Sequence, residues 1–141
     1  MNVLLDTSVV SELYRTNPDQ RVRNAIRRRQ PSELFLSVIT IGEVLKGIEL
    51  LAPGRNRFRL EAWLAGLQGE FADRILPVDL ETGRTWGEIT ALARLRGRQI
   101  PVADGLIAAS ALRHGLRVMT RNTRDFASSG VPLIDPWADG E

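Results

Sequence analysis

Five short apolar segments, separated by stretches of helical character, constrain this sequence more than any other feature. They span residues 3–5, 34–38, 74–78, 117–120 and 131–134. Strands separated by single helices or helix pairs require right-handed crossovers, which produce a parallel sheet with helices on both faces. We therefore predict an α/β fold, a three-layer α/β/α domain whose central, mainly parallel sheet has about four to five strands.

Capping signals predict where the helices begin. Asn17 before Pro18 has the form of an N-cap followed by proline at the first helical position. Thr40 and Glu43 have the spacing of a capping box, in which each side chain accepts a hydrogen bond from the other residue's backbone N–H. Asp79 is an N-cap candidate. The predicted helices are residues 9–15, 18–29, 41–51, 56–70, 80–96 and 101–114.

Length and composition exclude several classes of protein. The 141 residues correspond to a single domain, residues 1–141, at about 100–200 residues per domain. Cysteine is absent and His114 is the only histidine, which removes disulfide frameworks, zinc–thiolate sites and cysteine nucleophiles. No apolar run approaches the roughly 20 residues that a membrane span needs. The N-terminus lacks the basic segment of a secretory signal, so we expect a cytoplasmic protein.

Four carboxylates come from four separate segments of the predicted fold. Asp6 ends the first strand, and Glu43 lies one helical turn after the second. Asp104 lies in the first turn of a helix, and Asp125 follows the fourth strand. Because ligands of parallel sheets bind beyond the carboxyl ends of the strands, we expect these side chains to share one edge. Carboxylates gathered there repel one another, and hard cations with oxygen ligands, magnesium or manganese, would neutralise them.

Each carboxylate also has a purely structural interpretation. Asp6 can cap the helix that follows it. Glu43 can be only the reciprocal partner of Thr40 in the capping box. The charge of Asp104 is favourable at a helix N-terminus, and Asp125 can be a surface turn residue. It is the combination of all four that favours a site.

The segments around the four carboxylates form ordered motifs. They are Leu4-Leu5-Asp6-Thr7-Ser8-Val9-Val10, Ser37-Val38-Ile39-Thr40-Ile41-Gly42-Glu43, Val102-Ala103-Asp104-Gly105-Leu106-Ile107-Ala108-Ala109 and Thr120-Arg121-Asn122-Thr123-Arg124-Asp125-Phe126. In order and spacing they resemble the PIN-domain ribonucleases, and most of all the VapC-type toxins of bacterial toxin–antitoxin pairs, in their FitB-like branch. The resemblance covers nearly the whole chain, including the closing Asp135-Pro136-Trp137.

The resemblance implies a PIN-like fold with a catalytic site made by Asp6, Glu43, Asp104 and Asp125. In the family, the carboxylates that match Asp6 and Asp104 are the usual direct magnesium ligands, whereas the other two act directly or through bound water. The position of Asp125 varies most in the family. Four polar neighbours can orient carboxylates or water, or can instead cap helices and stabilise turns. These neighbours are Thr7, Ser8, Thr120 and Asn122.

The implied function is that of a magnesium-dependent endoribonuclease, with manganese as a substitute ion, acting as the toxin of a toxin–antitoxin module. Metal-activated water would hydrolyse the RNA phosphodiester bond. The resemblance also implies a homodimer, a cognate antitoxin protein and no membrane partner. The alternative is a catalytically silent nucleic-acid-binding or regulatory protein on the same fold, which metal-dependent RNA cleavage would distinguish.

Basic residues concentrate in one part of the chain. Residues 82–124 contain eight arginines and two acidic residues, a net charge of +6, whereas the whole chain has +2. This asymmetry suits a phosphate backbone that approaches the acidic residues. The candidate RNA-binding residues are Arg94, Arg96, Arg98 and Arg121. For the first three, the alternative is a solvated helix end whose charge is favourable to the helix dipole.

Overall fold

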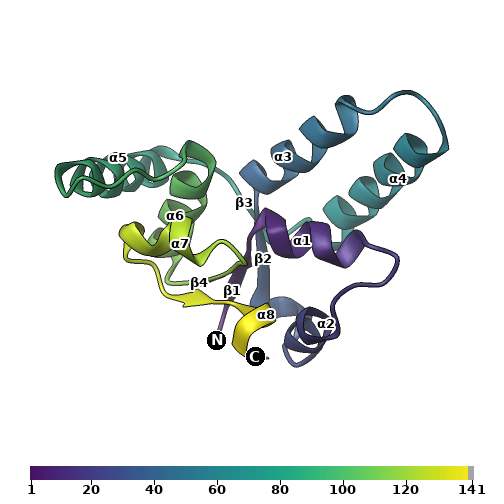
Figure 1. Cartoon of the computed structure of the whole chain (residues 1–141), viewed down its shortest axis with the longest axis horizontal. Helices are drawn as coiled ribbons and strands as arrows, with labels where there is room; N and C mark the ends of the chain where they lie inside the picture. The colour runs from purple at the N-terminus through teal and green to yellow at the C-terminus, as the bar shows by residue number, and fades with distance from the viewer. Residues whose placement is uncertain (140–141) are drawn as a thin grey trace.

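A parallel sheet of five strands crosses the middle of the molecule, and helices cover both of its faces (Figure 1). The computed structural model describes residues 1–139, so the last two residues of the predicted 1–141 domain lie outside the described residues. The predicted α/β fold is confirmed, and every strand pair is parallel. The strands are β1 (Val3–Leu5), β2 (Leu34–Ser37), β3 (Ile75–Leu76), β4 (Arg117–Met119) and β5 (Leu133–Ile134).

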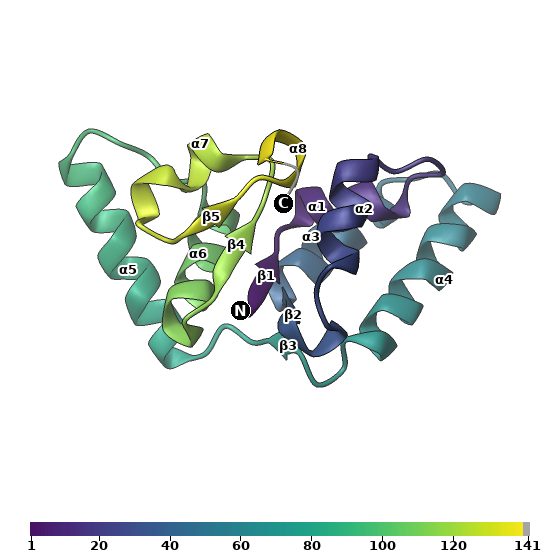
Figure 2. The same cartoon turned by 90° about the horizontal axis from the view of Figure 1, so that it is seen from below.

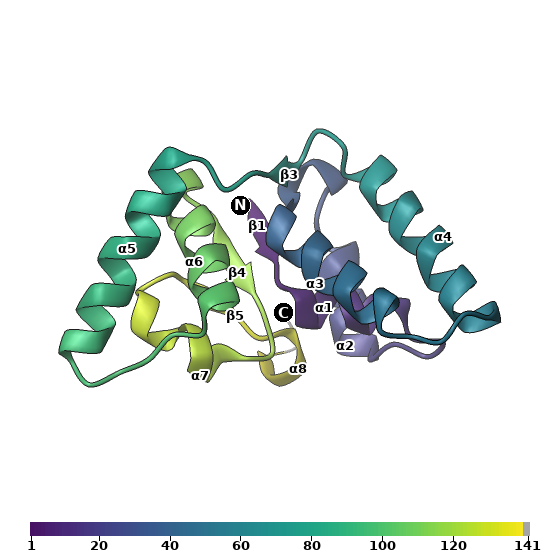
Figure 3. The same ribbon diagram turned by 90° about the horizontal axis from the view of Figure 1, so that it is seen from above.

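Helices of very different lengths connect the strands. Figures 2 and 3 show α4 and α5 as the outermost helices, at opposite sides of the molecule. Within residues 1–139, none of the helices is long and apolar enough to cross a membrane. The helices are α1 (Thr7–Tyr14), α2 (Gln20–Arg27), α3 (Val38–Glu49), α4 (Arg55–Glu70), α5 (Leu80–Leu95), α6 (Val102–His114), α7 (Thr123–Phe126) and α8 (Pro136–Asp139), with 3₁₀ turns η1 (Pro31–Glu33) and η2 (Ala127–Ser129).

The strand order β3-β2-β1-β4-β5 puts β1 at the centre of the sheet. Leu4 of β1 pairs with Phe35 of β2 on one side and with Val118 of β4 on the other. Because all three strands run the same way, their carboxyl ends lie at one edge, and the residues that follow them are neighbours. β3 is shorter than the predicted strand because Pro77, directly after it, has no backbone N–H for the ladder.

Alternate side chains of β1 pack into two separate cores. Val3 and Leu5 face one core and Leu4 faces the other, as the two-residue period of a strand requires. All three are at most 1% exposed, which is typical of a central strand in a parallel sheet. Side chains of α1 and α2 complete the first core, and side chains of α6 complete the second. The central strand is therefore held on both faces.

The start of α2 differs from the prediction. Its N-cap is Asp19, not Asn17, and the Asp19 carboxylate accepts a hydrogen bond from the backbone N–H of Arg21 at 2.9 Å. The backbone N–H of Asp19 donates in turn to the buried carboxylate of Glu12, also at 2.9 Å. This second bond fixes the chain just before the helix, so Asn17 remains in the loop after α1.

The predicted capping box of Thr40 and Glu43 is wrong. Strand β2 passes directly into α3, and Ser37, its last residue, is the N-cap. The Ser37 hydroxyl accepts from the backbone N–H of Ile39 at 3.0 Å. Thr40 and Glu43 both lie within the helix, which begins earlier than the predicted residue 41. The Thr–x–x–Glu spacing therefore matched the capping pattern at a place where the chain was already helical.

The ends of α5 and α6 agree better with the sequence. Asp79 caps α5 as predicted, and its carboxylate accepts from the backbone N–H of Thr82 at 2.9 Å. Pro101 is the N-cap of α6 and not its first helical residue. The helix ends before Gly115, whose φ of 67° is a left-handed conformation that glycine adopts without a Cβ clash. This helix delivers Asp104 to the sheet edge in its first turn.

Replacing Ser37 by alanine should lower the free energy of unfolding by about 1 kcal/mol, because the Ile39 N–H then loses its acceptor. Urea unfolding followed by circular dichroism measures the change. Ser32→Ala, at an exposed position, is the matched control and should alter stability by less than about 0.5 kcal/mol. Equal stability of the Ser37 variant and the wild type would contradict the assignment of this cap.

Candidate active site

The carboxyl ends of β1, β2 and β4 bring three polar segments together. β1 leads into Asp6, β2 ends at Ser37, and β4 leads into Thr120. Figure 3 shows α6 and α7 on one side of this edge and α1 and α3 on the other. Side chains from four helices can therefore meet over the ends of the central strands.

Asp6 is a buried carboxylate held by two hydroxyl groups. It is only 2% exposed, although it directly follows the central strand. Thr120 Oγ1 donates to Asp6 Oδ2 at 2.7 Å, and Ser8 Oγ donates to the same oxygen at 2.9 Å. Asp6 occupies the N-cap position of α1, but its side chain makes no capping hydrogen bond. The capping interpretation of this side chain is therefore wrong, and its orientation is set by the hydroxyls.

Glu43 is tied to α1 by a short hydrogen bond. Thr7 Oγ1 donates to Glu43 Oε1 at 2.5 Å and lies 3.1 Å from Thr40 Oγ1. Thr40 is fully buried, whereas the Glu43 side chain is exposed to solvent. Thr40 and Glu43, the two residues of the expected capping box, therefore both contact the Thr7 hydroxyl. This contact holds Glu43 at the solvent-exposed rim of the acidic edge.

Asp104 shows that all four predicted carboxylates share one electrostatic environment. Its side chain is partly buried, and burial is the largest cause that raises its pKa from 3.8 to about 6. The negative charges of Asp6, Asp125 and Glu43, in that order, raise this pKa further. A neighbouring like charge disfavours ionisation of a carboxyl group. The charges of the other three predicted carboxylates therefore all act on Asp104.

The segment after β4 completes this edge. The backbone N–H of Asn122 donates to Thr120 Oγ1 at 2.9 Å, and the N–H of Asp125 donates to the Asn122 carbonyl at 3.0 Å. Asp125 itself is exposed, on the short helix α7. Of the predicted supporting residues, Thr7, Ser8 and Thr120 bond to the carboxylates through their hydroxyls. Asn122 contributes through its backbone.

The donor set fits a partly hydrated magnesium ion. All of the side-chain donors are oxygens, and the raised pKa of Asp104 reflects surplus negative charge that a cation would offset. Within residues 1–139, no three acidic or histidine side chains are close enough together to hold an ion alone. Magnesium commonly keeps several waters and binds to one or two carboxylates, so Asp6 and Asp104 are the candidate protein ligands.

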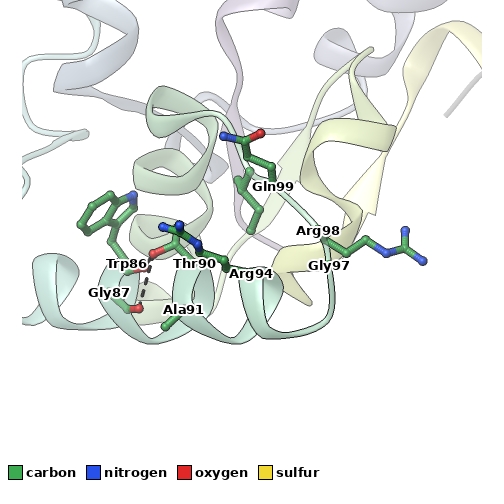
Figure 4. Close-up of a pocket in the computed structure, with 9 residues that line it drawn as sticks. Trp86, Gly87, Thr90, Ala91, Arg94, Gly97, Arg98 and Gln99 are labelled. Carbon is green, nitrogen blue, oxygen red and sulfur yellow. Dashed lines mark hydrogen bonds between the residues drawn. The ribbon is translucent and has the colours of Figure 1, made fainter.

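The predicted RNA-binding arginines occupy two different places. Arg94 and Arg98 line a cavity of about 770 Å³ with Trp86 and Gln99, on α5 and the residues after it (Figure 4). Arg96 faces a second hollow beside η2. None of these three is among the charges that act on Asp104. Arg121 directly follows Thr120 at the carboxylate edge, but its charge also is not among those that act on Asp104.

A groove next to the acidic edge has a lining that sequence reasoning missed. It lies between α1, α3 and α4 and has a volume of about 380 Å³. Tyr14 and Trp63 meet in it edge to face, with ring centroids 5.0 Å apart. Thr7 and Glu43 also line this groove, so it reaches the acidic edge at Glu43. The available signal was the three-residue spacing of Leu60 and Trp63, which puts both on one face of α4.

Comparison with known proteins agrees with this fold. The family model described as PIN domain matches residues 3–130. VapC ribonuclease Y4jK of Sinorhizobium fredii is 38% identical over 136 residues, which cover 96% of this chain and 97% of that protein. Toxin FitB of Neisseria gonorrhoeae is 38% identical over 141 residues, covering 97% and 99%. The crystal structure of FitAcB from Neisseria gonorrhoeae superimposes with a TM-score of 0.91 at 36% identity, covering 96% of this chain and 99% of that one.

The chain therefore belongs to the PIN-domain family. Its similarity to the VapC and FitB toxins extends over nearly the full length of both partners. The resemblance predicted from the four motifs is confirmed.

The raised pKa of Asp104 predicts an unusual pH dependence for the metal-free protein. With a folded pKa of about 6 against 3.8 ordinarily, the folded protein keeps a proton that the unfolded chain has released. The stability this group contributes is present below pH 3.8 and is lost as pH rises to about 6. In chelator, the melting temperature of Asp104→Asn minus that of wild type should therefore increase from pH 4 to pH 7.

Differential scanning calorimetry of both proteins across this range measures the difference, and the many other carboxylates cancel in the subtraction. Glu61→Gln, an exposed carboxylate on α4, is the control, and its difference from wild type should stay flat. A flat difference for Asp104→Asn as well would show that Asp104 titrates like an ordinary carboxylate.

Proposed function

We propose that this protein is a magnesium-dependent endoribonuclease, with manganese as a substitute ion, and acts as the toxin of a toxin–antitoxin module. The observation that carries the proposal is that three other carboxylates, Asp6, Asp125 and Glu43, act on Asp104 and raise its pKa. The named relatives, a VapC ribonuclease and a toxin, support RNA as the substrate and toxicity as the role.

In this proposal, Asp6 and Asp104 hold the metal through their carboxylate oxygens. Bound magnesium supplies a coordinated water of lowered pKa and positive charge beside the scissile phosphate. Thr120 and Ser8 keep Asp6 in one orientation, since both donate to Oδ2. Thr7 holds Glu43 at the rim, where Glu43 and Asp125 orient water or accept a proton from it.

A catalytically silent binding protein on the same fold is the second candidate. A silent protein would have no use for carboxylates that repel one another and raise the pKa of Asp104. The acidic edge is also a poor surface for a polyanion, because it repels phosphates unless a cation is present. Both points favour the nuclease.

The proposed partners are a cognate antitoxin and a second copy of the chain. The groove between α1, α3 and α4 suits apolar side chains of an antitoxin segment. Because Thr7 and Glu43 line one part of the groove, a basic side chain on that segment would reach the carboxylates and displace metal or RNA. Exposed apolar side chains on α5 support a homodimer, since Leu92 and Leu95, three residues apart on the helix, are 52% and 83% exposed.

Glu43→Gln tests the proposed site without disturbing the fold. Glutamine keeps an oxygen that accepts from Thr7, and one repelling charge is lost, so the metal-free melting temperature should be unchanged or slightly higher. Cleavage of total cellular RNA in magnesium should fall by about tenfold or more, as expected for loss of a group that supports a metal site. Initial cleavage rate and melting temperature are measured on the same samples.

Glu49→Gln, on the same helix but outside the cluster, should cleave like wild type. Chelator should stop cleavage by the wild type, and either magnesium or manganese should restore it. A stable Glu43→Gln variant with full activity would remove Glu43 from the site, and undiminished cleavage in chelator would reject the metal mechanism.

Leu60→Ala tests the antitoxin groove. Leu60 lines the groove, and loss of one buried leucine contact should weaken binding of the small protein encoded beside this gene by about tenfold. Phe58→Ala is the matched control, because Phe58 lies on the same helix, is 70% exposed and does not line the groove. Isothermal titration calorimetry gives both affinities. Equal affinities for the two variants would place the antitoxin elsewhere.

A further inference from the structure

Arg121 follows the carboxylate edge and has no acidic pairing partner among residues 1–138. It directly follows Thr120, whose hydroxyl bonds to Asp6. Its guanidinium carbon lies 5.1 Å from the centroid of the Trp137 ring, in a cation–π contact. Among residues 1–138, whose side chains the structure describes, the Arg121 guanidinium makes neither a hydrogen bond nor a salt bridge. The five N–H donors of the guanidinium are therefore available for hydrogen bonds to a ligand, while the Trp137 ring holds the side chain in place.

The backbone of Arg121 is attached to the carboxylate site. Its N–H donates to Ser8 Oγ at 3.2 Å, and Ser8 Oγ donates to Asp6 Oδ2 at 2.9 Å. The position of Arg121 along the edge is therefore coupled to that of the buried carboxylate. This coupling fixes one end of the arginine side chain.

Trp137 is an equally well fixed platform for the other end. Its ring is 6% exposed and belongs to the core that contains β1. Its backbone N–H donates to Asp135 Oδ1 at 2.9 Å, and its carbonyl accepts a hydrogen bond from Arg21. The Trp137 ring is therefore fixed in position. Because the Arg121 guanidinium stacks on this ring, its own position is restricted as well.

The neighbouring charges leave the positive charge of Arg121 available. Asp19 is the carboxylate on which Arg121 exerts an electrostatic effect, but Arg21 already binds both oxygens of Asp19, at 3.1 and 2.9 Å. Asp135 acts on Arg21 and binds the backbone of Trp137. A guanidinium that is fixed in place and not neutralised is well suited to bidentate recognition of a phosphate.

We propose that Arg121, supported by Trp137, binds a backbone phosphate of the RNA next to the one that is cut. This proposal rests on the proposed ribonuclease function and adds the residues that position the strand. The acidic cluster repels a polyanion, and a fixed cation at the same edge offsets that repulsion where the strand enters. Trp137 is a positioning residue: it is too buried to stack on a base, and it acts through Arg121.

The experiment measures RNA binding separately from cleavage. A fluorescently labelled single-stranded RNA pool of mixed sequence is titrated in chelator, and fluorescence anisotropy gives Kd at several salt concentrations. Arg121→Ala should raise Kd by about tenfold, and the slope of log K against log salt should fall by about 0.7, the value for one phosphate contact to a single strand. Arg121→Lys should recover only part of the affinity, because lysine keeps the charge without the planar fork.

A double-mutant cycle tests the role of Trp137. Trp137→Leu should raise Kd about threefold when Arg121 is present, the effect of losing one cation–π contact. In the Arg121→Ala background, the same change should have no further effect. Because Trp137 lies in a core, Trp137→Phe is a gentler second variant, and it should weaken binding by less than Trp137→Leu. Arg59→Ala, an exposed arginine on α4, controls for simple loss of charge and should leave Kd unchanged.

The outcomes separate this proposal from the one on which it rests. If the wild type neither binds RNA in chelator nor cleaves it in magnesium, the proposed ribonuclease function fails. If the wild type cleaves RNA in magnesium but binds none in chelator, the binding role of Arg121 is overturned. If the wild type binds and Arg121→Ala binds equally well, only the role of Arg121 is overturned. If Trp137→Leu weakens binding by the same factor with and without Arg121, Trp137 acts on binding by another route and the positioning role is wrong.

Discussion

The hydrogen bond between Thr120 and Asp6 is the interaction on which the rest of the site depends. A buried carboxylate is costly unless its oxygens find donors, and Asp6 is only 2% exposed. Thr120 supplies one donor from the end of β4, the strand paired with β1, and the Asn122 backbone N–H fixes that hydroxyl in turn. The parallel register of β1 and β4 therefore determines where Asp6 points, and the segment that carries Asp125 follows from it.

Repulsion among the carboxylates at this edge destabilises their ionised forms. Asp6 is held by hydroxyls, and Glu43 is held by Thr7, so neither can move away from its neighbours. Burial and the repulsion from these carboxylates together raise the pKa of Asp104 to about 6. A cation bound between these carboxylates would offset the repulsion, which is the physical basis of the proposed metal site.

The sequence predicted the four carboxylates because each follows, within a few residues, a strand end or a helix start that is visible in the sequence. Asp6 ends an apolar run, and Asp104 follows a proline that starts a helix. The start of α3 was mispredicted for an instructive reason. Ser37 lies at the end of the apolar run and looks like a strand residue, whereas Thr40 and Glu43 match a capping pattern that their real bonds to Thr7 do not use. Those bonds join residues more than thirty positions apart, which no local pattern encodes.

The net charge of a segment likewise does not show which of its arginines are neutralised by an acidic partner. The net charge of +6 over residues 82–124 includes Arg113, but Arg113 pairs with Asp79, which lies outside that segment, at 2.9 Å. Its charge is therefore neutralised locally and adds little to the field that RNA would meet. Arg121 contributes one equal charge to the count, yet it stacks on Trp137 and has no acidic partner among the described residues. The two arginines have the same formal charge but different neighbours in the fold. The neighbour of Arg121 is Trp137, because α8 packs against the loop after β4.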